Sequence, residues 1–160
     1  MMKIIGIDPG LATTGIGLLE TDDSRKPVSS DWFTIETPAR TPLSDRLAEL
    51  EADLTEYLNL TNPDLAVVER LFFATNEKTA LDVAHARGVI LLSLKSHQVQ
   101  ILEPTPLELK SCITGDGKAD KIQVQNMIMR ELKLNEPPKP DDATDALALA
   151  LFGVYQNTFV

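Results

Sequence analysis

The chain has 160 residues, of which 43% are hydrophobic and 24% charged, as is ordinary for one globular domain, expected here to span residues 1–160. Its formal net charge of −9 argues against binding of nucleic acid through a broad basic surface. The single cysteine, Cys112, excludes an intramolecular disulfide, and we interpret it as a small buried side chain rather than a catalytic thiol.

The charge is unevenly distributed along the chain. Residues 70–133 hold 9 Lys and Arg against 7 Asp and Glu, so any surface that binds a polyanion is expected there. The N-terminus has no basic segment with a long apolar stretch and a cleavage site. The longest apolar run, residues 146–155, is about half the length that a bilayer requires. We expect a cytoplasmic protein with no membrane partner.

The first residues predict three strands joined by hairpins. Residues 3–8 form a short apolar run that ends at Pro9-Gly10, a turn dipeptide. Residues 14–20 follow as a second strand. Residues 31–37, in which Phe33 and Ile35 alternate with other side chains, predict a third.

Two helices and a buried strand are predicted next. Thr41 as N-cap and Pro42 at the first helical position predict a helix start, and apolar residues then recur at helical spacing on an amphipathic surface helix. Residues 65–69 read as a central strand because they are almost continuously apolar. After a loop, residues 77–96 predict a long helix. Gly88 inside it costs about 1 kcal/mol relative to Ala unless close packing requires it.

The C-terminal part predicts one more strand and three helices. Residues 99–102 form the strand, and Thr105-Pro106-Leu107-Glu108 is a capping box that starts a short helix. Residues 120–133 and a segment from 141 to about 155 predict two further helices, separated by the proline-rich linker 137–140. Early hairpins followed by crossovers indicate a mixed five-stranded sheet with helices on both faces, so the fold class is α/β.

Four carboxylates are expected to meet at one edge of this sheet. Asp8 ends the first strand and Glu69 the fourth, so both emerge at the same edge if these strands are parallel neighbours. Asp142 and Asp145 are three residues apart in the first turn of the last helix, where they share a face. Such a cluster repels itself unless cations lie between its members, and hard cations such as Mg²⁺ and Mn²⁺ prefer oxygen ligands.

Each of these acids also has a simpler interpretation. Asp8 could start a turn, and Glu69 could be a solvated strand end. Asp141, beside Asp142, is interpreted as the N-cap of the last helix. The joint placement nevertheless favours a metal-dependent nuclease, in which two ions about 4 Å apart serve an in-line phosphodiester displacement. The sequence has neither a His–Cys cluster for zinc nor a Walker-type loop.

Five motifs, in order, are similar to those of a known family. They are Gly6-Ile7-Asp8-Pro9-Gly10 with Thr14-Gly15, Val68-Glu69-Arg70-Leu71-Phe72, Ala86-Arg87-Gly88-Val89, Lys121-Ile122-Gln123-Val124-Gln125, and Asp142-Ala143-Thr144-Asp145-Ala146-Leu147-Ala148. Together they resemble the RuvC family of Holliday-junction resolvases, from residue 3 to about residue 155. The resemblance implies a ribonuclease-H-like fold, a homodimer, and paired nicks in four-way DNA junctions.

The resemblance also implies roles for the acids and for one lysine. Asp8, Glu69, Asp142 and Asp145 would be catalytic and would bind two Mg²⁺ ions, for which Mn²⁺ can substitute. Lys121 would be catalytic as well, since an ammonium group stabilises the charge that develops on the scissile phosphate.

Further residues are implied to contact DNA or to support the fold. Phe72, Phe73 and Asn76 follow Glu69, where the family places an aromatic side chain against junction bases. A base–aromatic stack contributes about 1–3 kcal/mol. Lys110 and Lys118 are also implied to contact DNA. We expect Arg87 to support the dimer or the fold rather than the chemistry. His85 and His97 match no catalytic position, and we interpret both as surface or helix-packing residues. The branch-migration proteins RuvA and RuvB are implied as partners.

Three other functions compete with this reading. An actin- or sugar-kinase-like ATPase could use the turn at Asp8-Pro9-Gly10, but it needs a second, duplicated domain that 160 residues do not provide. A non-enzymatic scaffold on the same fold could bind a partner through the long helix, but it has no need for all four acids. A nuclease of the same fold could act on RNA–DNA hybrids or transposon ends, and only substrate comparison separates it from a junction resolvase.

Overall fold

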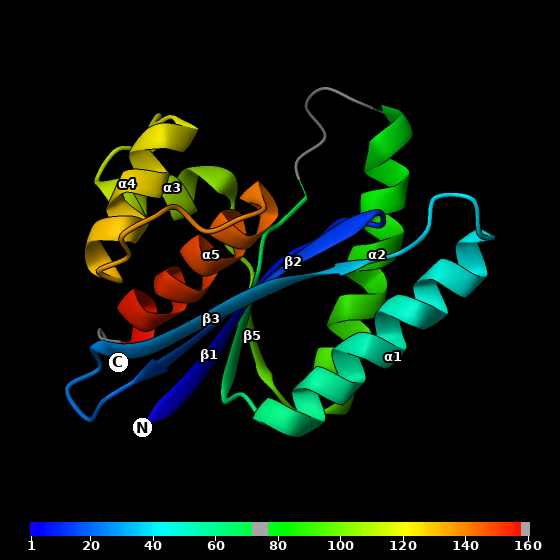
Figure 1. The fold of residues 1–160 in the computed structure, drawn as a ribbon, viewed down its shortest axis with the longest axis horizontal. Coiled ribbons are helices and arrows are strands. Elements are labelled where there is room, and N and C mark those ends of the chain that lie inside the picture. Colours follow the sequence, from blue (N-terminus) through cyan, green and yellow to red (C-terminus); the bar gives the residue numbers. More distant parts are fainter. Residues whose placement is uncertain (72–76, 158–160) are drawn as a thin grey trace.

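The computed structural model describes residues 1–71 and 77–157, and at its centre lies a five-stranded sheet in the order β3-β2-β1-β4-β5 (Figure 1). β1 pairs antiparallel with β2, and β2 with β3, whereas β4 is parallel to both β1 and β5. The strands are β1 (Met2–Asp8), β2 (Thr13–Thr21), β3 (Pro27–Glu36), β4 (Leu65–Val68) and β5 (Gln100–Leu102). The predicted mixed sheet is confirmed.

Helices cover both faces of the sheet, as predicted (Figure 1). Two pack on one face and three on the other. The first pair is α1 (Leu43–Thr61) and α2 (Glu77–Ser96); the other three are α3 (Pro106–Thr114), α4 (Lys121–Glu131) and α5 (Asp141–Asn157). Among the described residues, no helix is long and apolar enough to cross a membrane.

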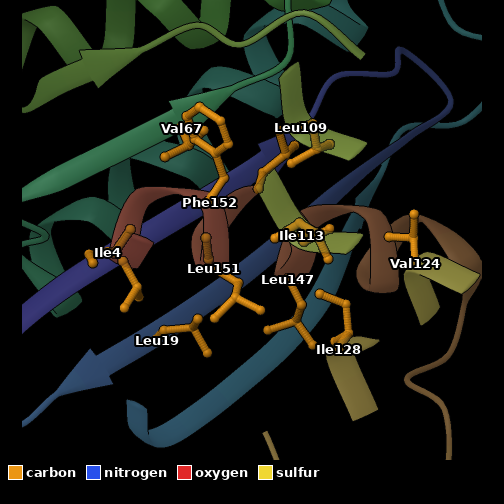
Figure 2. Packing of buried hydrophobic residues seen from close by; sticks show 14 of the residues in the cluster. Ile4, Leu19, Val67, Leu109, Ile113, Val124, Ile128, Leu147, Leu151 and Phe152 are labelled. Atoms are coloured by element: carbon orange, nitrogen blue, oxygen red, sulfur yellow. The ribbon is translucent and has the colours of Figure 1, made fainter. Parts of the chain in front are cut away.

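Strand residues alternate between two apolar cores because successive side chains point to opposite faces. In β4, Leu65 and Val67 belong to the core under α5, while Ala66 and Val68 belong to the core under α1 and α2. All four are buried, which confirms the central position predicted for this strand. Figure 2 shows the first core, in which α5 lies among side chains of the sheet, α3 and α4.

Glycines in β1 and β2 let α5 approach the sheet at backbone distance. A Cβ at Gly6 would overlap the carbonyl oxygen of Ala146, and a Cβ at Gly17 would lie 2.8 Å from the backbone nitrogen of Leu147. At Gly15 a Cβ would overlap the carbonyl oxygen of Asp142. The absence of side chains at these three positions therefore places the N-terminal half of α5 directly against the sheet.

The start of α1 differs from the prediction by one residue. Pro42, not Thr41, is the N-cap, and no side chain caps the helix. The Thr41 hydroxyl donates to the carbonyl of Pro38 at 2.5 Å. The prediction was wrong because the preceding turn uses this hydroxyl.

Local signals further along the chain agree better with the structure. The capping box of α3 forms as predicted, with Thr105 accepting from the backbone of Glu108 and the Glu108 carboxylate accepting in return. α4 has a second capping box, between Asp120 and Gln123, so Asp120 precedes the helix instead of belonging to it. A Cβ at Gly88 would meet open space, so packing within the chain does not require this glycine.

Candidate active site

Asp8 and Glu69 emerge at the same edge of the sheet, as predicted. β1 and β4 are parallel neighbours, and Ile7 lies opposite Val68 in their register. Asp8 is the last residue of β1, and Glu69 directly follows β4. Both side chains therefore leave the sheet where its parallel strands end.

The N-terminal part of α5 brings a third acid to this edge, one turn after the helix begins. Asp145 lines a pocket of about 240 Å³ together with Asp8 and Glu69. Lys110 of α3 and Lys121 of α4 line the same pocket. These five residues come from four elements and from the strand end after β4, so the tertiary fold assembles the site.

Burial and mutual repulsion act on all three acids of the pocket. The pKa of Asp8 is raised to about 8, first by burial and then by the charges of Asp145, Glu69 and Asp142. The pKa of Glu69 is raised by burial and by Asp145, while Lys110 lowers it. Burial also raises the pKa of Asp145, against the opposing effect of Lys121. Asp142 does not line the pocket, but its charge acts on Asp8.

Two of the three predicted lysines reach the acids. Lys110 lines the pocket, and Nζ of Lys121 lies 3.3 Å from Oδ2 of Asp145. Lys118 is exposed and is not part of the pocket lining, and its backbone N–H donates to Asp116.

Asp141 corrects a prediction. It is the first residue of α5 rather than its N-cap, and its Oδ2 lies 3.4 Å from Nζ of Lys121. The sequence did not predict this contact, because an acid at the start of a helix can equally serve as the N-cap or form an ion pair with another element. The one available signal was the spacing of four residues between Asp141 and Asp145, which places both on one helix face.

Arg87 supports the fold beside the site. Its Nε donates to the carbonyl oxygen of Glu69 at 3.0 Å, and its guanidinium pairs with Glu103. The backbone N–H of Arg70 also donates to Pro104, at 2.9 Å. These bonds hold the peptide group that joins Glu69 to Arg70, directly after the Glu69 side chain, in agreement with the role in the fold expected for Arg87.

The remaining predicted residues are a mixed set. His85 is exposed, and Nδ1 of His97 lies 2.7 Å from the carbonyl oxygen of Ser93, as expected for surface and helix-packing residues. Cys112 is partly buried, and burial raises the pKa of its thiol. The predicted DNA-contacting residues of the loop lie outside the described residues; they are Phe72, Phe73 and Asn76.

The donors at this site suit a hard divalent cation. They are carboxylate oxygens, which Mg²⁺ and Mn²⁺ prefer, without the sulfur or imidazole ligands typical of zinc. Among the described residues, no three Asp, Glu, His or Cys side chains converge closely enough to form a metal cluster as they stand. In this arrangement Asp145 is paired with Lys121, and the repulsion between the acids opposes a closer approach without a cation.

A mixed sheet of this order, with acids at the ends of β1 and β4 and at the start of α5, defines a ribonuclease-H-like nuclease. The family model for crossover junction endodeoxyribonuclease RuvC matches residues 4–152. The chain belongs to the RuvC family. It is thus an endodeoxyribonuclease that resolves Holliday junctions in recombination and repair, and nucleases of this family depend on metal ions.

Individual relatives match along nearly their whole length. The crossover junction endodeoxyribonuclease RuvC of Caldicellulosiruptor saccharolyticus is 42% identical over 159 residues, which cover 99% of this chain and 96% of that one. That of Synechococcus sp. strain RCC307 is 45% identical, over 98% of this chain and all of its own. T. thermophilus RuvC, solved in complex with a Holliday junction substrate, superimposes with a TM-score of 0.91 at 28% identity, covering 99% and 96% of the two chains.

Proposed function

We propose that the pocket between β1, β4, α3, α4 and α5 is the nuclease active site, and that Asp8, Glu69, Asp142 and Asp145 hold its divalent cations. The observation that carries this proposal is the set of three acids in one pocket, each with a raised pKa. Carboxylates that repel one another in this way are stabilised by a cation between them. Perturbed acids that converge in a pocket are also a mark of a functional site.

The cations supply an activated water and neutralise charge on the phosphate when bound, and we propose two Mg²⁺ ions, replaceable by Mn²⁺. The two lysines act on the substrate. Lys121 and Lys110 approach the pocket from α4 and α3, and each ammonium group can donate hydrogen bonds to phosphate oxygens. Lys121 stabilises the charge that develops on the scissile phosphate. Asp8 adjoins the charges of the other three acids, so its loss should impair the site most.

DNA contacts outside the pocket belong to the mildly basic part of the chain. Lys118 is exposed on the segment between α3 and α4 and is proposed to contact the DNA backbone. Phe72, Phe73 and Asn76 are proposed to contact junction bases, on the family resemblance alone. With a net charge of −9, few phosphate contacts are expected, so the affinity should fall only weakly with rising salt.

We also propose that two copies of the chain associate through α2. Leu81 and Leu92 are 64% and 68% exposed, and Gly88 lies between them with open space before it. They lie near one face of the helix, and with a second copy against it the apolar surface would leave water. Paired nicks need two active sites, which a homodimer provides. Cooperation with RuvA and RuvB rests on the family resemblance.

Light scattering after gel filtration tests the dimer. Leu92→Glu should shift the protein to a monomer, whereas Leu60→Glu, at a 79% exposed position on α1, should not. A dimer that survives Leu92→Glu would refute this interface.

The nuclease proposal is tested with a synthetic four-way junction beside a linear duplex and an RNA–DNA hybrid, in Mg²⁺ or EDTA. The unsubstituted protein should nick the junction in pairs and leave 5′-phosphates. EDTA and Asp8→Asn should each abolish the nicks, while Asp53→Asn, the same change at an exposed position on α1, should not. Cleavage that survives Asp8→Asn would refute the site, and preference for the hybrid would refute the substrate.

A further inference from the structure

Asp141 contacts a lysine of the site although it is not one of the four predicted acids. Its Oδ2 lies 3.4 Å from Nζ of Lys121, and Oδ2 of Asp145 lies 3.3 Å from the same nitrogen. Asp141 and Asp145 are four residues apart on α5 and share a face. The ammonium group is therefore held by two carboxylates of one helix.

Lys121 gains little from its own helix. It is the first residue of α4, where a positive side chain is unfavourable because the helix N-terminus carries partial positive charge. That terminus is capped by Asp120 and Gln123, without Lys121. Asp141, by contrast, lies in the first turn of α5, where a negative side chain is favourable. The position of the ammonium group is thus set by α5.

The carboxylates of Asp141 and Asp145 differ in their position relative to the pocket. Asp145 lines the pocket with Asp8 and Glu69, whereas Asp141 is not part of the lining and its side chain is 75% exposed. A cation bound by Asp145 would compete with Lys121 for that carboxylate. The ion pair of Asp141 with Lys121 lies outside the pocket lining and would not be subject to this competition.

On the basis of the proposed function, we propose that Asp141 is a positioning residue for Lys121. It leaves Asp145 free for a cation and keeps Lys121 within reach of the substrate phosphate. Asp141 touches neither the cation nor the substrate and acts through the lysine. Without Asp141, Lys121 keeps only the ion pair with Asp145 among those found in the described residues, and it competes with the cation for that carboxylate.

Mg²⁺ binding to the full chain, measured by calorimetry in a double-mutant cycle, tests this role. Asp141→Asn should raise the Kd for Mg²⁺ about two- to fivefold, the range that one exposed ion pair sets. In a Lys121→Met background the same substitution should change Kd by less than about twofold. Asp141→Glu should restore the affinity. Glu136→Gln removes an equal charge from the linker before α5 and should leave Kd unchanged.

The rate of junction cleavage is a second measurement for the same double-mutant cycle. In single turnover at saturating Mg²⁺, Asp141→Asn should slow cleavage about two- to fivefold, and this loss should disappear in the Lys121→Met background. A loss in the unsubstituted background that vanishes without Lys121 is what a positioning role requires.

Other outcomes overturn the inference. Equal effects of Asp141→Asn in both backgrounds would mean that its charge acts directly, and no effect in either would mean that it has no role. Asp145→Asn separates this failure from failure of the proposed function. If Asp145→Asn abolishes Mg²⁺ binding while Asp141→Asn changes nothing, only the inference fails. If Mg²⁺ binding survives Asp145→Asn, the proposed site fails and the inference with it.

Discussion

Replacing Asp8 by Asn should stabilise the metal-free protein while it destroys the active site. The pKa of Asp8 is raised from 3.8 to about 8 in the folded chain, so folding favours the protonated acid. Below about pH 4, Asp8 is protonated in both states and does not change the free energy of unfolding. As the pH rises from about 4 to about 8, Asp8 ionises in the unfolded state first, and the free energy of unfolding falls. Asn is neutral throughout this range and avoids the loss. The site thus trades stability for function.

The magnitude follows from the displacement of the pKa. Each pH unit above the unfolded-state pKa of 3.8 favours ionisation, and hence unfolding, by about 1.4 kcal/mol as long as Asp8 stays protonated in the folded state. At about pH 7 this amounts to about 4 kcal/mol. Because Asp8 keeps some exposure to solvent, we expect a gain of about 1–3 kcal/mol for Asp8→Asn. The gain should be smaller at about pH 5 and larger at about pH 8.

Urea denaturation in EDTA, at one protein concentration and at several pH values, measures this gain. Asp53→Asn, at an exposed position on α1, should change the free energy of unfolding by less than about 0.5 kcal/mol. Mg²⁺ should stabilise the unsubstituted protein more than the variant, because it binds the folded state through these acids. An Asp8→Asn protein that is less stable in EDTA, or a gain that does not depend on pH, would refute the reasoning. Either result would favour the interpretation of Asp8 as a turn residue.

Three further changes have defined outcomes. Gly6→Ala should lower the stability by about 3 kcal/mol or more, because its Cβ would overlap the backbone of α5, and a thermal melt unchanged from that of the natural sequence would contradict this close approach. Thr105→Ala should lose about 1 kcal/mol in urea denaturation, since it removes the capping box of α3. An unchanged free energy of unfolding would mean that the capping box does not contribute to the stability. Lys121→Met should slow single-turnover cleavage of a four-way junction about ten- to a hundredfold but change the stability by less than about 1 kcal/mol, as its ion pairs are exposed. Cleavage at an unchanged rate would exclude Lys121 from catalysis.

The sheet and the placement of Asp8 and Glu69 were predictable because they depend on local patterns. Apolar runs and turn residues mark the strands, and the rule for parallel neighbours then puts both acids at one edge. The capping box of α3 was predictable for the same reason, since four consecutive positions carry the whole signal. The start of α1 was not predictable in this way, because the turn that precedes the helix and the helix N-terminus can both use the Thr41 hydroxyl, and the turn does so.

The contacts within the site were beyond the reach of local patterns. Lys121 and Asp141 are twenty residues apart on different helices, and their ion pair depends on how α4 packs against α5. Arg87 reaches the carbonyl of Glu69 from a helix on the far side of a loop. The loop itself, with its aromatic residues, lies outside the described residues, so its proposed part in junction binding stays a prediction.

The glycines beneath α5 have a consequence for how the site tolerates sequence drift. At Gly6, Gly15 and Gly17 the helix rests on main chain, so its height above the sheet does not depend on the size of any side chain at those three positions. Substitutions elsewhere in the core can alter the packing around the helix while this standoff stays constant. The distance between the acid that ends β1 and the acids near the start of α5 therefore depends on the absence of a Cβ at these three positions. We expect this distance to tolerate substitutions at the surrounding positions better than a substitution of any of the three glycines.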